Sequence, residues 1–257
     1  MPEIPDLNVF RANLAKQLVG KTLKEFKVLV PRQLKVPESA LKEAFEGSVL
    51  TGIDRLGKEL YFKFQNGHVL GLHLMLHGTM YWYQDTNENK FTIAELLFSD
   101  GIGLAITDWQ KAVMLKLDPE PLTAPDAMEI PEGYLRTALK QTPRHIKTVL
   151  TEGKVVQGIG NAYVDEILYT AKISPFSKAD KIPADKINAL CKAIENVLTD
   201  AEKHIFDMFP DTITDKERDF LKVHLPKHKE TPLGEPILKA EIDKRKTYYT
   251  ADQILFE

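Results

Sequence analysis

The first three residues, Met1-Pro2-Glu3, place a potential nucleophile beside a carboxylate. If Met1 is removed, Pro2 becomes the chain terminus and carries a free secondary amine. The ordinary pKa of an α-amino group is about 7.7–8.0, against about 10.4 for lysine, so much more of it is neutral and nucleophilic near pH 7. A secondary amine that condenses with an aldehyde forms an iminium, a cation that promotes bond breaking at the adjacent carbons. A frayed N-terminus is the ordinary alternative for such a segment.

A second segment, Gln157-Gly158-Ile159-Gly160-Asn161, could bind phosphate between two expected helices. One helix is expected to end near Gly153 and the next to start near Asn161. The glycines permit close backbone approach, and the N–H groups that open a helix attract anions. Asn161 can add a side-chain donor. A joint between two helices with packing glycines is the alternative.

A third candidate is Lys58, which follows Gly57 at the start of an apolar strand expected over Leu60–Phe64. A single lysine is ordinarily a surface residue, so Lys58 carries no functional inference by itself.

Composition limits the class of protein. A chain of 257 residues that is 43% hydrophobic can form one large domain or two ordinary ones. No apolar run approaches the length of a transmembrane helix, and the N-terminus lacks a signal-peptide pattern, so a cytoplasmic or nucleoid location is expected. The single cysteine, Cys191, excludes an internal disulfide framework and a cysteine-rich zinc site. A net charge of −3 does not indicate a strongly basic nucleic-acid binder, but it permits a local basic face.

The first half of the chain predicts a helix followed by an antiparallel β-sandwich. Apolar residues at helical spacing precede Gly20, and β-branched and aromatic residues alternate from Ser48 to about Leu117. The other expected elements and turns are a strand over Thr22–Val30, a helix over Ser39–Gly47 with Ser39 as N-cap, hairpin turns at Asn66-Gly67 and Asp100-Gly101, and a polar turn over Asp85–Lys90.

The second half predicts helices and then two short strands. Proline-rich Leu117–Pro131 breaks the periodicity and indicates a hinge. Helical periodicity begins at Glu132, and Cys191 falls on an apolar stripe, so it is expected in the core. Short strands are expected at Ile237–Ile242 and Thr247–Ile254. The predicted organisation is a sandwich domain over residues 1–117, a hinge over 118–131, a helical domain over 132–224 and a hairpin over 225–257.

Over essentially its whole length the sequence resembles the formamidopyrimidine-DNA glycosylase / endonuclease VIII family. The implied fold is α+β: an N-terminal antiparallel β-sandwich with an N-terminal helix, then a helix–two-turn–helix domain that ends in a β-hairpin finger. The resemblance implies a catalytic set and a DNA-binding set. The catalytic set is Pro2 as Schiff-base nucleophile, Glu3 as acid/base partner and Lys58 as catalytic lysine. The DNA-binding set is Gly158, Gly160 and Asn161 as phosphate contacts. Glu166 falls at the recurring acidic position of the helix–two-turn–helix motif and is expected to support the active site.

The C-terminal finger departs from the family's zinc-binding pattern. The four cysteine positions correspond to Glu230, Leu233, Thr250 and Gln253, none of which has a thiolate. The turn with Arg245 is retained, so the segment resembles the zincless finger of some members, and Arg245 is expected to bind DNA. A solvated turn is the alternative, and no cofactor is expected.

Two loops resemble those that the family inserts into DNA beside an everted nucleotide. In Met75-Leu76-His77-Gly78, Leu76 is the expected wedge, and a buried leucine at a strand end is the alternative. The second loop, Asp108–Ala112, lacks the family's phenylalanine and has Gln and Lys111 where arginines stand, so strict cytosine-opposite specificity is not predicted. The lesion-specificity loop corresponds to Pro175–Lys186 or Asp207–Lys222.

The resemblance implies a bifunctional DNA glycosylase and AP lyase. Such an enzyme excises an oxidised base from damaged double-stranded DNA and cleaves the abasic site by β,δ-elimination. A monomer without a membrane partner is expected. Two alternatives stay open: a damage-binding protein of the same fold without glycosylase activity, and an RNA- or ribosome-associated protein with the same helical motif.

Overall fold

The computed structural model describes residues 1–214 and 218–257, which form two compact units. The first contains residues 1–121 and 205–214, and the second contains 122–204 and 218–257. Residues 215–217 belong to one predicted specificity loop, Asp207–Lys222, and that part of the prediction lies outside the described residues. In the described part of the chain, no helix has the length and apolar character that a membrane span requires.

Helix α1 (Ile4–Leu18) opens the first unit where the apolar spacing predicts it. Its start is fixed by a capping box, in which Glu3 and Asp6 each accept a hydrogen bond from the other's backbone N–H. Its end is followed by Gly20, which has a φ of +87°. Most of its side chains are buried, among them Leu7, Phe10, Leu14 and Leu18.

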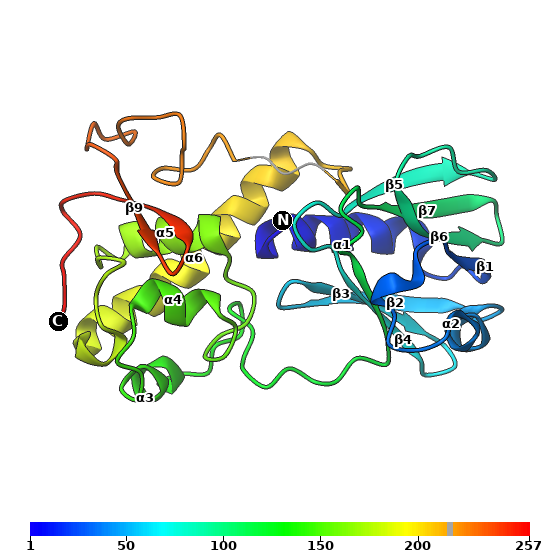
Figure 1. Cartoon of the computed structure of the whole chain (residues 1–257), viewed down its shortest axis with the longest axis horizontal. Helices are drawn as coiled ribbons and strands as arrows, with labels where there is room; N and C mark the ends of the chain where they lie inside the picture. The colour runs from blue at the N-terminus through cyan, green and yellow to red at the C-terminus, as the bar shows by residue number, and fades with distance from the viewer. Residues whose placement is uncertain (215–217) are drawn as a thin grey trace. The chain divides into compact units, whose positions relative to one another are not determined.

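Two four-stranded antiparallel sheets share one hydrophobic core with α1, which confirms the predicted sandwich (Figure 1). The first sheet has the order β1 (Leu23–Val28), β6 (Thr92–Phe98), β7 (Ile102–Thr107), β5 (Thr79–Gln84). The second has the order β2 (Leu50–Leu56), β3 (Glu59–Phe64), β4 (Val69–His73), β8 (Met114–Leu117). Strand β7, which lies between β6 and β5, is buried from Gly103 to Thr107, whereas β5 at the edge of the sheet has only Met80 buried.

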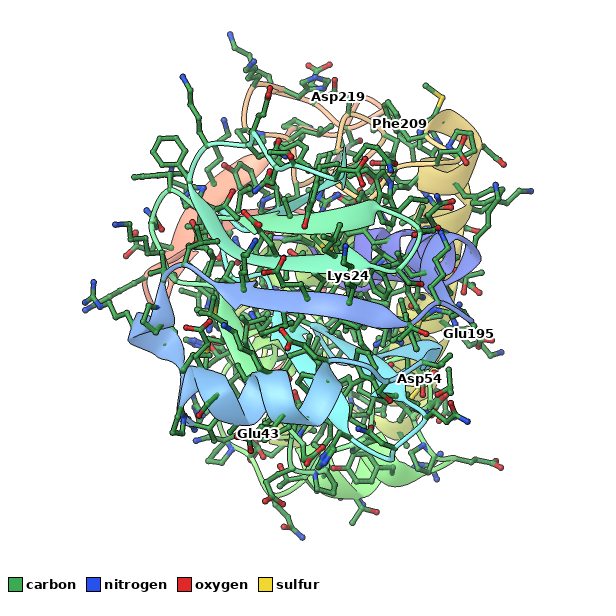
Figure 2. The ribbon with its side chains drawn as sticks, turned by 90° about the vertical axis from the view of Figure 1, so that its right-hand side faces the viewer. Lys24, Glu43, Asp54, Glu195, Phe209 and Asp219 are labelled. Atoms are coloured by element: carbon green, nitrogen blue, oxygen red, sulfur yellow. The ribbon has the colours of Figure 1, made fainter. Side chains whose placement is uncertain are left out.

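The predicted hairpin turns form, but two local predictions are corrected. Asn66-Gly67 joins β3 to β4, and Asp100-Gly101 joins β6 to β7. Segment 85–90 is not a hairpin turn, because β5 and β6 both pair with β7 and not with each other. Helix α2 (Glu38–Phe45) begins after Pro37, so Ser39 lies inside the helix and not at its N-cap. Figure 2 shows Lys24 at β1 and Glu43 on α2.

The second unit is built around helix α5 (Asn161–Thr170), whose side chains are buried from Ala162 to Tyr169. The other elements are α3 (Tyr134–Leu139), α4 (Ile146–Thr151), the short 3-10 helix Ala179–Lys181 and α6 (Ala184–Met208), whose residues from 205 on belong to the first unit. Gly153, with a φ of +78°, follows α4, as predicted for the end of that helix. The apolar stripe lies along α6, where Cys191 is half-buried and burial raises the pKa of its thiol.

The C-terminal hairpin pairs β9 (Leu238–Ile242) with β10 (Arg245–Tyr249). Its turn consists of Asp243 and Lys244, whose φ values of 48° and 62° are those of a two-residue turn with both residues left-handed. The second strand therefore begins at Arg245 and ends at Tyr249, instead of covering the expected Thr247–Ile254.

Residues 205–214 belong to the first unit, which the sequence pattern did not indicate. Asn13 Nδ2 donates to Thr212 O at 2.8 Å, and Ile213 joins the core of the sandwich. Proline content predicts the division at 118–131, and helical periodicity predicts a continuous helical domain over 132–224. Neither signal carries information on such a return of the chain.

Candidate functional site

Pro2 and Glu3 are buried at the start of α1. The Glu3 backbone N–H donates to Asp6 Oδ2 at 2.7 Å, and the Glu3 carboxylate accepts from the Asp6 backbone N–H. The N-terminus of a helix favours negative charge, so the fold holds a carboxylate in a defined place directly after Pro2. Met1 precedes Pro2 in the structure, so the Pro2 nitrogen is there an amide.

Lys58 lies in the turn between β2 and β3, after Gly57 with a φ of +59°. Arg55 ties this turn to α1. Its Nε donates to Asn8 Oδ1 at 2.6 Å, and its Nη1 donates to Gly57 O at 3.1 Å. The structure therefore brings the turn with Lys58 next to the first half of the helix that begins after Glu3.

His73, at the end of β4, is a residue of this region that the sequence analysis did not identify. Burial lowers the pKa of its imidazole, and the cations of Lys116 and Lys58 lower it further against the opposing effect of Glu59. Its Nδ1 lies 3.0 Å from the Met75 backbone N–H, which donates to it. A neutral imidazole is required for that acceptor, so the lowered pKa and the hydrogen bond support each other.

The predicted wedge residue Leu76 is 55% exposed, which rules out the alternative of a buried strand-end leucine. It lies in a tight loop over residues 75–78, where Met75 has a φ of 54°. Gly78 closes the loop by donating its N–H to Leu74 O at 2.9 Å. A Cβ at Gly78 would lie 2.1 Å from that oxygen and 2.7 Å from Val113 Cγ2, so only glycine fits.

The second predicted loop, residues 108–112, is organised by the buried carboxylate of Asp108. Its oxygens accept the backbone N–H groups of Gln110, Ala112 and Val113 at 2.7–3.1 Å. Lys111 is exposed and has a φ of 57°. The rings of His77 and Trp109 lie 4.9 Å apart, so this loop is adjacent to the one with Leu76.

In the second unit, the segment between α4 and α5 has the expected geometry for a helix-joining turn. Gly158 has a φ of +100°, and Gly160 is the N-cap of α5 in an extended conformation. Asn161 occupies the first helical position, and its Nδ2 donates to Lys246 O at 3.0 Å. The predicted phosphate-binding side chain therefore contacts the strand that also carries Arg245.

Arg245 is half-buried and donates through Nη1 to Thr151 Oγ1 on α4. At the turn, Asp243 Oδ2 accepts from Thr148 Oγ1 at 2.6 Å. The neighbouring Lys246 side chain is exposed. Contacts to α4 thus hold the predicted DNA-binding turn at both of its ends.

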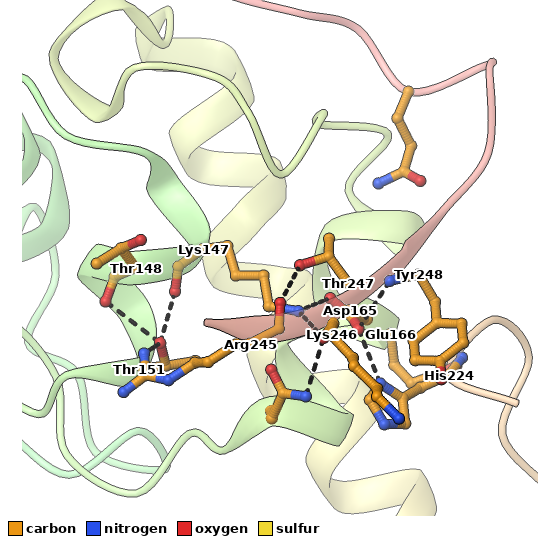
Figure 3. A network of polar contacts seen from close by, with 12 residues as sticks. Lys147, Thr148, Thr151, Asp165, Glu166, His224, Arg245, Lys246, Thr247 and Tyr248 are labelled. Atoms are coloured by element: carbon orange, nitrogen blue, oxygen red, sulfur yellow. Dashed lines mark hydrogen bonds and ion pairs between the residues drawn. The ribbon is translucent and has the colours of Figure 1, made fainter. Parts of the chain in front are cut away.

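A buried ion pair lies beneath this hairpin, and the sequence analysis did not identify it (Figure 3). Lys147, with no exposed side-chain surface, donates to Asp165 Oδ1 at 2.7 Å and to Lys246 O at 2.9 Å. Asp165 Oδ2 accepts the Tyr248 N–H at 3.1 Å and lies 2.7 Å from His224 Nδ1. A lysine and an aspartate within helical patterns ordinarily face solvent, so the sequence offered no signal for this pair.

Glu166, the acidic residue of the predicted motif, is also buried. Its carboxylate accepts the backbone N–H groups of Lys222, Val223 and His224 at 2.7–2.9 Å. Burial raises the pKa of this carboxyl group, and the three hydrogen bonds act in the opposite direction. The geometry is that of a residue that fixes the backbone over 222–224.

The four positions that would correspond to zinc ligands do not fit a zinc ion. Glu230 and Leu233 are exposed, whereas Thr250 and Gln253 are buried. Gln253 Oε1 accepts the Thr250 N–H at 2.7 Å, and Gln253 Nε2 donates to Ile173 O at 2.8 Å. The set offers one carboxylate and neither the thiolates nor the imidazoles of a structural zinc site.

Comparisons with known proteins agree with this geometry. The family model "Formamidopyrimidine-DNA glycosylase N-terminal domain" matches residues 1–114, and "Formamidopyrimidine-DNA glycosylase H2TH domain" matches residues 117–206. The formamidopyrimidine-DNA glycosylase of Enterococcus faecalis is 31% identical, with coverage of 97% of this chain and 95% of that protein. The corresponding protein of Lactobacillus helveticus is 30% identical, with coverage of 79% and 78%.

Solved structures show the same fold. Lactococcus lactis Fpg in complex with DNA containing an abasic site superposes with a TM-score of 0.87 at 26% identity, covering 98% of this chain and 100% of that one. MutM in complex with DNA containing carbocyclic 8-oxo-G superposes with a TM-score of 0.87 at 28% identity, covering 97% and 98%. On the sequence matches and the shared fold, the chain belongs to the formamidopyrimidine-DNA glycosylase family.

Proposed function

We propose that this protein is a DNA glycosylase of DNA repair that removes oxidised bases from damaged double-stranded DNA and cleaves the resulting abasic site through a Schiff base on Pro2. Family membership supports the glycosylase activity. The observation that carries the finer proposal is the buried pair of Pro2 and Glu3 at the start of α1, where Asp6 fixes the Glu3 backbone and side chain. A nucleophile needs such a held partner to transfer protons.

In the proposed reaction, the Pro2 amine, released by removal of Met1, attacks C1′ of the everted nucleotide. The C1′–N bond breaks, and the base leaves with a proton. Glu3 transfers protons at the sugar while the sugar ring opens and C1′ forms an iminium with the Pro2 nitrogen. The iminium acidifies the C2′ proton; its loss expels the 3′ phosphate, and a second elimination expels the 5′ phosphate. Water then releases the sugar remnant from Pro2, and no cofactor is required.

The remaining site residues bind and position the DNA in this proposal. Asn161, Arg245 and the backbone at Gly158 and Gly160 bind phosphates, because N–H donors and a guanidinium suit phosphate oxygens. Lys58 binds a phosphate next to the lesion. Exposed Leu76 fills the space left by the everted nucleotide, Lys111 contacts the backbone beside it, and Glu166 supports the site. The protein acts as a monomer.

The second candidate function is binding of damaged DNA without excision. It is favoured by the loop over 108–112, where Gln110, Lys111 and Ala112 supply neither the guanidinium fork nor the phenylalanine of the family's pattern. The two functions share the fold and differ in whether Pro2 forms a covalent intermediate.

Borohydride trapping tests the proposal directly. The protein is incubated with duplexes that carry an oxidised purine, an oxidised pyrimidine or an abasic site, and the adduct is mapped by mass spectrometry. We expect a covalent adduct on Pro2 in protein that lacks Met1. The matched control carries an N-terminal extension before Pro2, which converts the amine into an amide and should abolish trapping.

Glu3→Gln separates excision from binding. It retains the shape of the side chain but removes the titrating carboxyl group. Excision should therefore be lost while lesion DNA is still bound, and abasic DNA should be cleaved more readily than lesion DNA.

In the trapping experiment, equal adduct formation by the protein with the N-terminal extension would place the nucleophile elsewhere, with Lys58 the first residue to examine. Lesion binding without any adduct would support the second candidate function.

A further inference from the structure

An open groove of about 760 Å³ lies in the first unit at one end of the sheet β1-β6-β7-β5. Three aromatic side chains along it are unusually exposed: Phe91 by 64%, Trp109 by 58% and Tyr81 by 40%. Single exposed aromatic residues are common, but three in one groove indicate a binding surface. The lining residues are His77, Thr79, Tyr81, Asn89, Lys90, Phe91, Thr107, Asp108 and Trp109.

The sheet itself produces the outward face of the groove. On β5, Thr79 and Tyr81 flank Met80, which is fully buried, so the two flanking side chains point away from the core. Thr107 pairs with Thr79 across the strands, and their hydroxyl oxygens lie 2.7 Å apart. The floor of the groove is therefore polar, and the exposed rings of Tyr81, Phe91 and Trp109 line it.

Phe91 is held in its exposed position by an ordered loop. Asn87 Nδ2 donates to Thr92 Oγ1 at 3.0 Å and to Glu95 Oε1 at 2.8 Å, and Asn87 Oδ1 accepts the Asn89 N–H at 2.9 Å. The Asp108 N–H donates to Phe91 O at 2.9 Å and joins this loop to the next one. A loop whose backbone is already ordered loses little conformational entropy when a ligand binds.

The backbone around the groove is strained. Phe91 has a φ of 59° and Lys111 a φ of 57°, a conformation that costs an L-residue with a Cβ about 1–3 kcal/mol. Such residues cluster at ligand-binding sites, because the surrounding structure maintains the strain there. These two residues lie in the loops that carry the exposed rings of Phe91 and Trp109.

We propose that this groove binds unpaired bases of single-stranded DNA by stacking. Every base has a π-face that can stack on Phe91, Trp109 or Tyr81, and the polar floor can accept hydrogen bonds from base edges. Lys90 and Lys111 are exposed and can neutralise phosphates, whereas the Asp108 carboxylate is already occupied by backbone N–H groups.

The choice of DNA as occupant depends on the proposed function. Contact between the rings of His77 and Trp109 makes the groove continuous with the loop that carries Leu76, the residue proposed to fill the lesion gap. A strand unpaired beside that gap would reach the groove without leaving the first unit. An apolar segment of another protein is the competing occupant. Lys90 and the two threonines of the groove, with Lys111 in the loop that carries Trp109, favour DNA over it.

Tryptophan fluorescence tests the groove alone. The chain has two tryptophans, so Trp82→Phe leaves Trp109 as the only one. Addition of a short oligothymidylate should quench Trp109 in a saturable and salt-dependent manner. Phe91→Ala should weaken this binding by roughly 5- to 150-fold, the range for loss of one stacking partner. The matched control is Phe206→Ala, which removes a 49% exposed ring that does not line the groove.

The outcomes separate this inference from the proposed function. Unchanged Trp109 fluorescence, or equal oligothymidylate affinity in Phe91→Ala and the Phe206→Ala control, would overturn the groove as a single-strand site. Quenching by an apolar peptide and not by oligothymidylate would overturn it in favour of a protein partner. Borohydride trapping on a blunt lesion duplex is measured in parallel: its absence alongside normal quenching would refute the proposed reaction and leave the groove intact. Circular dichroism confirms that each variant is folded.

Discussion

Replacement of Lys147 by Met should destabilise the second unit far more than loss of a surface lysine. Lys147 Nζ lies 2.7 Å from Asp165 Oδ1 and 2.9 Å from Lys246 O, and neither side chain of the ion pair has exposed surface. Methionine fills a similar volume but supplies no charge. The Asp165 carboxylate then remains buried with only His224 and the Tyr248 N–H beside it.

The magnitude follows from this burial. Removal of one partner of a buried ion pair costs about 3–5 kcal/mol, because the other charge is left uncompensated. Unfolding free energies of domains are about 5–15 kcal/mol, so this loss is a large fraction of the total. By contrast, Lys172 forms an ion pair with Glu235 in which its own side chain is 43% exposed. Such a pair contributes about 0–1 kcal/mol, which makes Lys172→Met the matched control.

Urea unfolding followed by far-UV circular dichroism is the assay. Both tryptophans, Trp82 and Trp109, lie in the first unit, so their fluorescence reports that unit while the helical signal includes the second. Asp165→Asn in the Lys147→Met background should recover part of the loss, since it removes the orphaned charge. Equal effects of Lys147→Met and Lys172→Met, or no recovery in the double variant, would refute the reasoning.

Three further predictions concern Glu235, Gly78 and the metal-free finger. Hydrogen bonds from Tyr169 and then Lys172 lower the pKa of Glu235 to about 2, below its unfolded value of about 4.3. The unfolded chain therefore binds the proton first, so Glu235 should stabilise the fold above about pH 4.3 and lose that contribution toward pH 2. Glu235→Gln should flatten this part of the stability profile. Gly78→Ala should lower the melting temperature because its Cβ would meet Leu74 O at 2.1 Å, whereas Gly52→Ala, with no atom within 4 Å, should not. A metal chelator should change neither the melting temperature nor trapping, and stoichiometric zinc in purified protein would contradict this.

The sequence predicted the elements whose signals are local. Helix α1 is marked by apolar spacing and by Gly20, and the turn at Asn66-Gly67 by its residue types. The joint before Asn161 is marked by Gly158, whose φ of +100° is a conformation that glycine adopts far more easily than other residues. In each case the physical cause lies within a few residues of the effect, so a pattern in the sequence suffices.

The features that the sequence did not reveal depend on contacts between distant residues. The strand order β1-β6-β7-β5 and the return of residues 205–214 to the sandwich leave no periodic trace. Lys147 and Asp165 each look like ordinary polar helix residues, and only the packing of α4, α5 and β10 makes them a buried pair. The exposed groove at Phe91 was missed for the same reason, because its rings come from three separate loops and strands.

The hairpin shows how a turn can be held without a metal. In a zinc finger, cysteine thiolates would bind a zinc ion at the base of the hairpin. Here Gln253 Nε2 instead donates to Ile173 O, which links the segment after β10 to that residue. At the other end, Lys147 and Asn161 both donate to the carbonyl of Lys246, the residue next to Arg245. A zinc ion fixes its ligands from one centre, whereas these hydrogen bonds fix the hairpin from two sides. The backbone next to Arg245 therefore depends on Lys147. On the proposal that Arg245 binds DNA phosphates, DNA affinity should fall in Lys147→Met although that buried residue is inaccessible to DNA.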